Sequence, residues 1–517
     1  MKADSDELSK TAVYTQQPIE EYKGNPFIEA LPPILSVPEA IDAMTVMPGY
    51  SENERELDAH YRFHCVQRLF RYFQPLDTHI DIEQRVSRAI RQGYINRNPL
   101  TAQYVQKIRQ LDEAIVKRSL DSAAANAVKH TAAGFTIIGM SGVGKTTAIE
   151  RVLSLYPQYI MHTRYNGQPF CLKQLTWLKL DCPFDGSIKG LCINFFAEVD
   201  RVLGSDYARK YLPSKTTVDA MMPRMAQVAW NHGIGLLVID EIQHLSQAKS
   251  GGSDTMLNFF VALVNTIGVP VILIGTTKAM SILQSEFRQA RRGSGQGDLL
   301  WDRMQNDASW EIMIRSMWQY QWTKKACPLT TALKDTLYRE SQGIIDIAIK
   351  LYTLAQIKAI ADGTETITPE TLQTVAAEKL MLVKPMLDAL RSGERKRILK
   401  YEDIRPISVE DYISAQVSRI VPYEAPPTSL EEQAVLKLLE MDIPSATARK
   451  CVKKAMSANT SGQPLGTVVR KAFKLALNIP EQEANALNKN ADHNDLRQNV
   501  GYDAIKQAGY IADKDEW

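Results

Sequence analysis

The chain has 517 residues, with 61 Lys and Arg against 59 Asp and Glu, and a formal net charge of +2. This near-neutral total excludes a wholly basic nucleic-acid coat, although it is compatible with a local basic strip. The length predicts about two to four domains, and the hydrophobic content of 44% is enough for a substantial core.

The first part of the chain is expected to form two regions. Residues 1–50 are rich in proline and polar residues, which predicts an extended N-terminal arm, free or docked, and not a packed domain. Residues 51–131 have apolar residues at helical spacing, such as Ile108, Leu111 and Ile115, which predicts a helical N-terminal region.

A phosphate-binding pattern follows. The run Gly139–Thr146 reads GxxxxGKT, with the apolar Phe135–Ile138 before it and helical spacing after it. A strand that passes through a glycine-rich turn into a helix forms a phosphate cradle, because backbone amides and the helix N-terminus face the anion. Lys145 is expected to reach the β- and γ-phosphates, and Thr146 to contact Mg²⁺. The alternative is a glycine-rich turn that precedes a lysine by chance.

A second buried strand ends in a pair of acids. Leu236–Ile239 is a continuous apolar run, as in a parallel strand buried on both faces, and Asp240 and Glu241 follow it. Ligands bind at the carboxyl ends of parallel strands, so both carboxylates are expected to face the phosphates. The run resembles a Walker B motif, in which Asp240 holds Mg²⁺ and Glu241 is the general base. An ordinary strand followed by a polar loop is the alternative.

Together the two motifs predict an ATPase that uses ATP and Mg²⁺. The residues expected to bind the nucleotide are Gly139, Ser141, Gly142, Val143, Gly144, Lys145, Thr146, Thr147 and Asp240. The expected metal ligands are Thr146 and Asp240.

A third apolar run, Val269–Ile274, is followed by Thr276 and Thr277. The P-loop and the acidic strand resemble those of AAA+ ATPases. In that family a polar residue at this strand end, called sensor 1, contacts the γ-phosphate or the attacking water. The resemblance assigns this role to Thr276, with Thr277 as the second choice; capping of a following helix is the alternative.

Three arginines then lie close together in the sequence. AAA+ proteins assemble head to tail, and an arginine of one subunit reaches the γ-phosphate that its neighbour holds, where it stabilises transition-state charge. The resemblance makes Arg288, Arg291 and Arg292 the candidates for this role. A solvated basic face is the competing interpretation.

The resemblance and the alternation of strands and helices predict an α/β fold, with an AAA+ P-loop NTPase core over residues 132–330. Its parallel sheet is expected to have strands near Phe135, Trp177, Leu236 and Val269, and an uncertain one near Trp318. AAA+ proteins often use residues upstream of the P-loop to wall the adenine, which is an alternative to simple helical packing for residues 51–131.

Residues 331–383 are expected to form the small helical lid of an AAA+ module. In many relatives a lid arginine called sensor 2 follows a glycine by three residues. Here Asp346 stands three residues after Gly343, and Lys350 one turn further on is a candidate substitute. This departure from the family pattern leaves a standard sensor 2 without support.

Residues 384–517 are expected to form a C-terminal basic helical region with a polar tail that binds a partner. A proline-rich linker near Pro426 divides this region. Before the linker, the basic residues are Arg391, Arg395, Lys396, Arg397 and Lys400; after it they include Arg449, Lys450, Lys453, Lys454, Arg470, Lys471 and Lys474. The first group is expected to contact DNA or a protein partner, or to be a charged helix surface.

Several phrases of the sequence resemble one family, TnsC, the AAA+ regulators of multi-component cut-and-paste DNA transposons. The most specific are the proline-rich Asn25–Pro33 and the phrase Ile239–Ser246, with Phe73–Leu76, Met256–Val261 and Ala290–Gly293 in support. The likeness covers about residues 25–393 and fades in the C-terminal region.

The resemblance implies a regulator of DNA transposition that binds ATP and assembles with itself as a ring or filament on duplex DNA. It further implies that the protein takes a signal from a target selector, TnsD or a TniQ-type protein, and activates the transposase subunits TnsA and TnsB. Hydrolysis of ATP would disassemble the oligomer. The DNA contacts expected on this basis are Ser187 and Lys189, where a solvated lysine is the alternative.

A second hypothesis is a signalling or scaffold NTPase that gates protein contacts without DNA. A replication-initiator-like loader is a third, although the sequence shows no recognisable winged-helix segment. The six cysteines form no CxxC or Cys/His cluster, the N-terminus lacks an apolar signal region, and no apolar run approaches the length of a membrane span. We therefore expect a cytoplasmic protein with no membrane partner.

Overall fold

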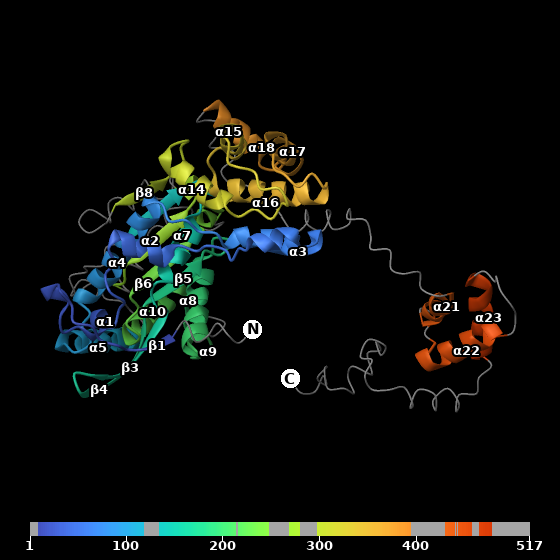
Figure 1. The fold of residues 1–517 in the computed structure, drawn as a ribbon. Helices are drawn as coiled ribbons and strands as arrows, with labels where there is room; N and C mark the ends of the chain where they lie inside the picture. Colours follow the sequence, from blue (N-terminus) through green and yellow to red (C-terminus); the bar gives the residue numbers. More distant parts are fainter. Residues whose placement is uncertain are drawn as a thin grey trace. The chain divides into compact units, whose positions relative to one another are not determined.

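The computed structural model describes residues 9–117, 134–212, 216–247, 268–279, 297–393, 430–439, 441, 443–457 and 465–477 (Figure 1). The chain divides into two compact units, residues 1–417 and 418–517, which are described separately. Among the described residues, no helix has the length and apolar character needed to cross a membrane.

The centre of the first unit is a five-stranded sheet in the order β5-β6-β7-β2-β8, in which all neighbours are parallel. Its strands are β2 (Phe135–Gly139), β5 (Trp177–Asp181), β6 (Leu236–Asp240), β7 (Val271–Gly275) and β8 (Asp298–Trp301). Every residue of β2, β6 and β7 is buried, which explains their continuous apolar runs, since helices cover both faces of such a sheet.

The fifth strand is not near Trp318, where it was expected. Trp318 is the last residue of helix α14 (Ala308–Trp318), and the fifth strand is β8, which pairs with β2 at the edge of the sheet. The helix begins because the Asp307 side chain accepts hydrogen bonds from the amides of Ser309 and Trp310. Its apolar residues then follow helical spacing, so the run near Trp318 is a helix end.

Helices of the first unit surround this sheet. They are α4 (Asp77–Ile95), α5 (Ala102–Lys117), α7 (Lys145–Leu153), α8 (Ile188–Leu203), α9 (Tyr207–Tyr211) and α10 (Val218–Asn231). Short 3-10 turns are η1 (Glu20–Tyr22), η2 (Glu52–Glu56), η3 (Gln67–Arg71), η4 (Ile242–Gln247) and η5 (Thr277–Ala279).

The N-terminal arm is docked and partly helical. It contains α1 (Pro26–Glu29) and α2 (Val37–Met44), and α3 (Ala59–Val66) follows. Phe27 is fully buried, and the Asn25 side chain donates a hydrogen bond to the Tyr94 carbonyl at 2.8 Å. The expected extended conformation gives way to helix because Asn25 and Ser36 cap these helices and prolines occupy their first turns.

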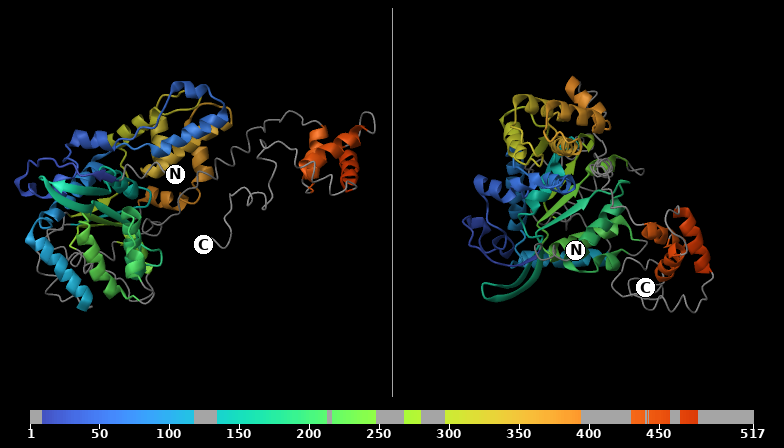
Figure 2. Two further views of the ribbon diagram at one scale, coloured as in Figure 1. Left: turned by 90° about the horizontal axis from the view of Figure 1, so that it is seen from below. Right: turned by 45° about the vertical axis from the view of Figure 1, so that its right-hand side comes forward.

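A small second sheet, in the order β1-β3-β4, was not predicted from the sequence. It consists of β1 (Ser9–Thr11), β3 (Tyr159–Tyr165) and β4 (Gln168–Leu175). The β3–β4 hairpin projects from the core in both views (Figure 2). Its turn is Asn166-Gly167, with φ of 47° and 80°, and Asn-Gly between two β-prone runs is the sequence signal that could have located it.

Up to residue 393, where the described part of the first unit ends, four helices follow α14: α15 (Thr331–Ser341), α16 (Ile345–Ala361), α17 (Pro369–Lys379) and α18 (Lys384–Ser392). Helix α3 runs alongside α16 (Figure 1). A buried ion pair joins the α3 region to the loop after α16, because both guanidinium nitrogens of Arg62 lie 2.7 Å from the Glu365 carboxylate oxygens. Helix α3 and the loop after α16 are thereby held together.

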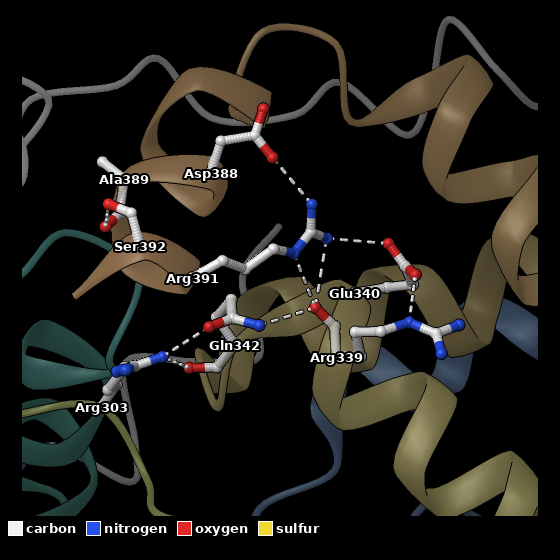
Figure 3. A network of polar contacts seen from close by, with 8 residues as sticks. All are labelled: Arg303, Arg339, Glu340, Gln342, Asp388, Ala389, Arg391 and Ser392. Atoms are coloured by element: carbon white, nitrogen blue, oxygen red, sulfur yellow. Dashed lines mark hydrogen bonds and ion pairs between the residues drawn. The ribbon is translucent and has the colours of Figure 1, made fainter.

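Arg391 belongs to a polar network between α18 and α15 (Figure 3). Its guanidinium donates to the Arg339 carbonyl at 3.1 Å, and it pairs with Glu340 and Asp388 at 2.8 Å each. Because these contacts engage the guanidinium, Arg391 is better explained as a structural residue that joins α18 to α15 than as a DNA or transposase contact. The basic residues from Arg395 to Lys400 lie outside the described part of the chain.

The described part of the second unit contains three helices, α21 (Leu430–Leu439), α22 (Ser445–Ser457) and α23 (Leu465–Leu477). Their buried core is Ala434, Leu438, Ala448, Cys451, Val452, Ala455, Val468, Val469 and Ala472. Helices α22 and α23 contain no acidic residue, and their exposed cations are Arg449, Lys450, Lys453, Lys454, Arg470 and Lys474.

Candidate nucleotide-binding site

The two predicted motifs meet at a cavity of about 430 Å³ at the carboxyl edge of the central sheet. One half of its wall is polar: Ser141, Gly142, Gly144, Lys145, Thr146, Thr147, Asp240, Glu241, Gln243, Gly275 and Thr276. The other half is largely apolar: Phe70, Tyr72, Phe73, Gln74, His79, Met313, Ile345, Asp346 and Ile349.

The glycine-rich turn has the backbone conformation that a phosphate cradle needs. Gly142 and Gly144 have φ of 82° and 101°, a region that side-chain-bearing residues avoid. Gly144 is the N-cap of α7, so the first amides of the helix face the cavity beside Lys145. Of the other predicted binding residues, Gly139 ends β2 and Val143 is fully buried behind the turn.

Lys145 is largely buried, with 8% of its surface exposed. Its ammonium donates to the carbonyls of Gly139 and Met140, each at 2.8 Å. These contacts hold the lysine against its own loop. Because Lys145 also lines the cavity, its ammonium group is placed to bind a phosphate oxygen in place of one of these carbonyls.

Thr146 and Asp240 come together as predicted for a metal site. The Thr146 hydroxyl donates to Oδ2 of Asp240 at 2.8 Å, and the Glu241 amide donates to Oδ1 at 2.8 Å. Burial raises the pKa of Asp240, although these hydrogen bonds and the Lys179 ammonium 3.8 Å away act in the opposite direction. A hydroxyl and a carboxylate are hard oxygen ligands, so this pair fits Mg²⁺.

Glu241 and Thr276 also line the cavity, and they directly follow the neighbouring strands β6 and β7. Glu241 has a φ of 58°, so the chain turns sharply directly after Asp240. The Thr276 hydroxyl is buried and has no hydrogen-bond partner among the described residues, which is also true of the Thr277 hydroxyl. Thr277 begins the η5 turn and does not line the cavity.

The apolar half of the cavity comes from three distant parts of the sequence: the stretch from Phe70 to His79, Met313 of α14, and α16. Tyr72 is anchored there because its hydroxyl donates to the Met313 carbonyl at 3.0 Å. Burial lowers the pKa of His79 to about 4, so its imidazole is neutral at physiological pH. Flat and apolar surfaces beside a phosphate cradle suit a nucleobase.

Asp346 occupies the position where a sensor 2 arginine was considered. It lines the cavity, and its amide donates to the Gly142 carbonyl in the phosphate loop at 3.2 Å. Lys350 forms an ion pair with Asp346 at 2.7 Å and does not itself line the cavity. The first turn of α16 is therefore hydrogen-bonded directly to the phosphate loop. At this point it presents the carboxyl group of Asp346 and not a guanidinium group.

The remaining predicted residues lie elsewhere. Ser187 is the N-cap of α8 and accepts a hydrogen bond from the Gly190 amide at 3.1 Å, and Lys189 is exposed in the first turn. The candidate arginines Arg288, Arg291 and Arg292 fall outside the described residues, as do the resembling phrases Met256–Val261 and Ala290–Gly293.

Comparisons with known proteins agree with this architecture. A family model described as an AAA domain matches residues 128–283. No curated protein matches the chain.

Similar solved structures include ORC1 of Aeropyrum pernix in complex with DNA, at 14% identity and a TM-score of 0.34, covering 72% of this chain and 82% of that chain. CDC6P of Pyrobaculum aerophilum has 13% identity and a TM-score of 0.33, with 80% and 87% covered. Drosophila ORC bound to DNA has 12% identity and a TM-score of 0.33, with 80% and 93% covered.

The fold is thus an AAA+ P-loop NTPase fold, with a parallel five-stranded sheet and helical regions before and after it. The phosphate loop follows β2, and the two acids follow or end β6 two strands away.

Proposed function

We propose that this protein is an ATP-dependent, DNA-binding regulator of transposition that oligomerises on target DNA and is disassembled by ATP hydrolysis. The observation that carries the ATP part is the composition of the cavity. It has a phosphate cradle and two acids at one end and an apolar wall at the other. A nucleoside triphosphate has this distribution of charge and apolar surface.

Five residues of the polar half would take part in hydrolysis. Thr146 and Asp240 would hold Mg²⁺, which supplies positive charge that neutralises the phosphates. Lys145 would bind the terminal phosphates, and Glu241 would orient and deprotonate the attacking water. Thr276 has a spare buried hydroxyl for the γ-phosphate or the water. Arg288, Arg291 or Arg292 would act on the site of a neighbouring subunit.

The DNA part rests on the phrases shared with TnsC and on the distribution of charge. The exposed cations of α22 and α23, and Lys189 on α8, offer phosphate contacts that need no high net charge, since an oligomer on DNA repeats each weak contact. By the same resemblance, the partners are a target selector, TnsD or a TniQ-type protein, and the transposase subunits TnsA and TnsB.

Electron microscopy of the protein with duplex DNA and a non-hydrolysable ATP analogue tests this proposal. Rings or filaments around DNA, absent without nucleotide and weakened by salt, are the expected result. Lys145→Ala should abolish ATP-dependent retention on DNA. A protein that hydrolyses ATP but never associates with duplex DNA would instead be the signalling or scaffold NTPase.

A further inference from the structure

Gln243 joins the two catalytic strand ends. It lies in η4, two residues after Glu241, and only 3% of its surface is exposed. Its side-chain oxygen accepts a hydrogen bond from the Thr276 amide at 3.0 Å, and its Nε2 donates to Oε2 of Glu241. One carboxamide therefore spans from the end of β6 to the end of β7.

The chemistry of the partners fixes the orientation of this carboxamide. A backbone amide can only donate, so the oxygen of Gln243 must face Thr276. An ionised carboxylate can only accept, so the NH₂ group must face Glu241. A glutamate in place of Gln243 would keep the first contact and lose the second.

The fold leaves room for the bridge at Gly275. A Cβ atom at this position would lie 3.1 Å from Oε1 of Gln243 and 2.6 Å from Cγ1 of Ile242. A residue with a side chain at this position would therefore force the side chain of Ile242 to move and would crowd that of Gln243. A glycine at the end of β7 thus favours this arrangement.

We propose that Gln243 is a positioning residue for Glu241: it holds the carboxylate of the general base in register with the end of β7. This inference rests on the proposed ATP hydrolysis. A general base must lie within hydrogen-bond reach of the proton that it removes. Because Gln243 occupies Oε2, it leaves Oε1 of Glu241 for the water and fixes the direction in which that oxygen points. The β7 end, with the unpartnered hydroxyl of Thr276, is the other surface of the same cavity.

The test compares Gln243→Leu and Gln243→Glu with a matched control, Gln356→Leu. Gln356 is also fully buried and also bridges backbone groups, since it accepts from the Trp322 amide at 2.8 Å and donates to the Tyr320 carbonyl at 3.0 Å. It lies in the lid, away from the cavity, so Gln356→Leu reports the cost of losing a buried glutamine.

Both Gln243 variants should lower kcat for ATP by about 100-fold, since positioned general bases contribute about 10²–10⁴-fold. The KM and the affinity for a fluorescent ATP analogue should stay close to those of the control variant. Gln243→Leu added to Glu241→Gln should cause no further loss of turnover. A kcat that falls no more than in Gln356→Leu would overturn the proposal, as would a fall matched by an equal loss of nucleotide affinity.

Hydrogen exchange in the nucleotide-free protein tests the bridge independently of activity. The Thr276 amide should exchange faster in Gln243→Leu than in Gln243→Glu, because only the glutamate retains an acceptor. Equal exchange in both variants and the wild type would overturn the bridge even if ATP is hydrolysed. If the exchange changes as expected but the wild type never hydrolyses ATP, the proposed function fails and Gln243 has no base to position.

Discussion

The hydroxyl of Thr146 lies 2.8 Å from Oδ2 of Asp240, although 94 residues separate them in the sequence. The contact joins the first turn of α7, the helix that follows β2, to the end of β6, which lies two places from β2 in the sheet. The two side chains form a preformed pair of oxygen ligands. The carboxyl group of Asp240 is buried, and this burial opposes its ionisation.

Replacing Asp240 by Asn should stabilise the nucleotide-free protein at alkaline pH. Burial raises the pKa of Asp240, so the folded state binds the proton more tightly than the unfolded state does, and folding loses stability as pH rises through the raised pKa. An uncharged asparagine side chain lacks this penalty. The Tm of Asp240→Asn should exceed that of the wild type at pH 8 and match it near pH 4. Each kcal/mol gained in the free energy of unfolding should raise Tm by roughly 2–4 °C.

Thermal unfolding across pH, without nucleotide or Mg²⁺, measures this difference. A Tm difference that does not vary with pH would contradict the assignment. With Mg²⁺ and ATP present the order should reverse, because Asn is a poorer metal ligand than a carboxylate and the variant gains less from binding.

Glu241→Gln should leave nucleotide binding intact and lower phosphate release by about 10²–10⁴-fold, because the amide cannot accept the water's proton. If hydrolysis disassembles the oligomer, DNA-bound assemblies of this variant should persist in ATP as they do with a non-hydrolysable analogue. Phosphate release and sedimentation with DNA measure the two effects. Hydrolysis at the native rate would show that another group is the base.

Ile349→Ala should weaken the binding of ATP through the base and not through the phosphates. Ile349 lines the apolar half of the cavity from α16, and loss of part of its contact with a base should cost about 1 kcal/mol, or about fivefold in Kd. Isothermal titration with ATP and with inorganic triphosphate separates the two halves.

The matched control for this variant is Ile312→Ala, because Ile312 is 57% exposed on α14 and does not line the cavity. It should leave both affinities unchanged. If Ile349→Ala weakened the binding of ATP and of inorganic triphosphate equally, α16 would not contact the nucleobase.

Glu365→Gln should destabilise the first unit, because it leaves the buried Arg62 guanidinium without its carboxylate. Breaking a buried pair costs about 3–5 kcal/mol. Burial alone would raise the pKa of Glu365, but its hydrogen bonds with Arg62 and the Lys324 amide hold that pKa below its ordinary value. This contribution is therefore present at neutral pH and is lost as pH falls through the folded pKa.

Thermal unfolding at pH 7 checks this effect, with Asp206→Asn as the control. Asp206 pairs with Arg209 at 2.6 Å, but both side chains are largely exposed, so the control should leave Tm unchanged. Similar Tm values for Glu365→Gln and the control would show that the buried pair does not stabilise the lid.

Most of the polar half of the site could be predicted because most of its residues lie in or beside two short and continuous motifs. The conformations of Gly142 and Gly144, the start of α7 at Lys145 and the position of Asp240 all depend on neighbours within a few residues. The apolar half could not be predicted residue by residue. The wall formed by Phe70, Met313 and Ile349 exists only because α14 and α16 fold back onto a segment about 240 residues earlier.

The differences in the fold have similar causes. The weak edge strand β8 has four residues, of which three are not buried, so it lacks the apolar run that marks β2, β6 and β7. The β3–β4 hairpin did have a local signal in Asn166-Gly167, and reading it would have added the second sheet. The role of Gln243 needed the sheet order, because Thr276 is distant from it in the sequence.

The hydrogen bond from the Asp346 amide to the Gly142 carbonyl has a mechanical consequence. If a bound polyphosphate changes the conformation of the phosphate loop, either the first turn of α16 must move with the loop or the hydrogen bond between Asp346 and Gly142 must break. Helix α16 packs on α3, which Arg62 clamps at the far side. A rearrangement of the cradle would therefore be transmitted through α16 to α3, away from the pocket.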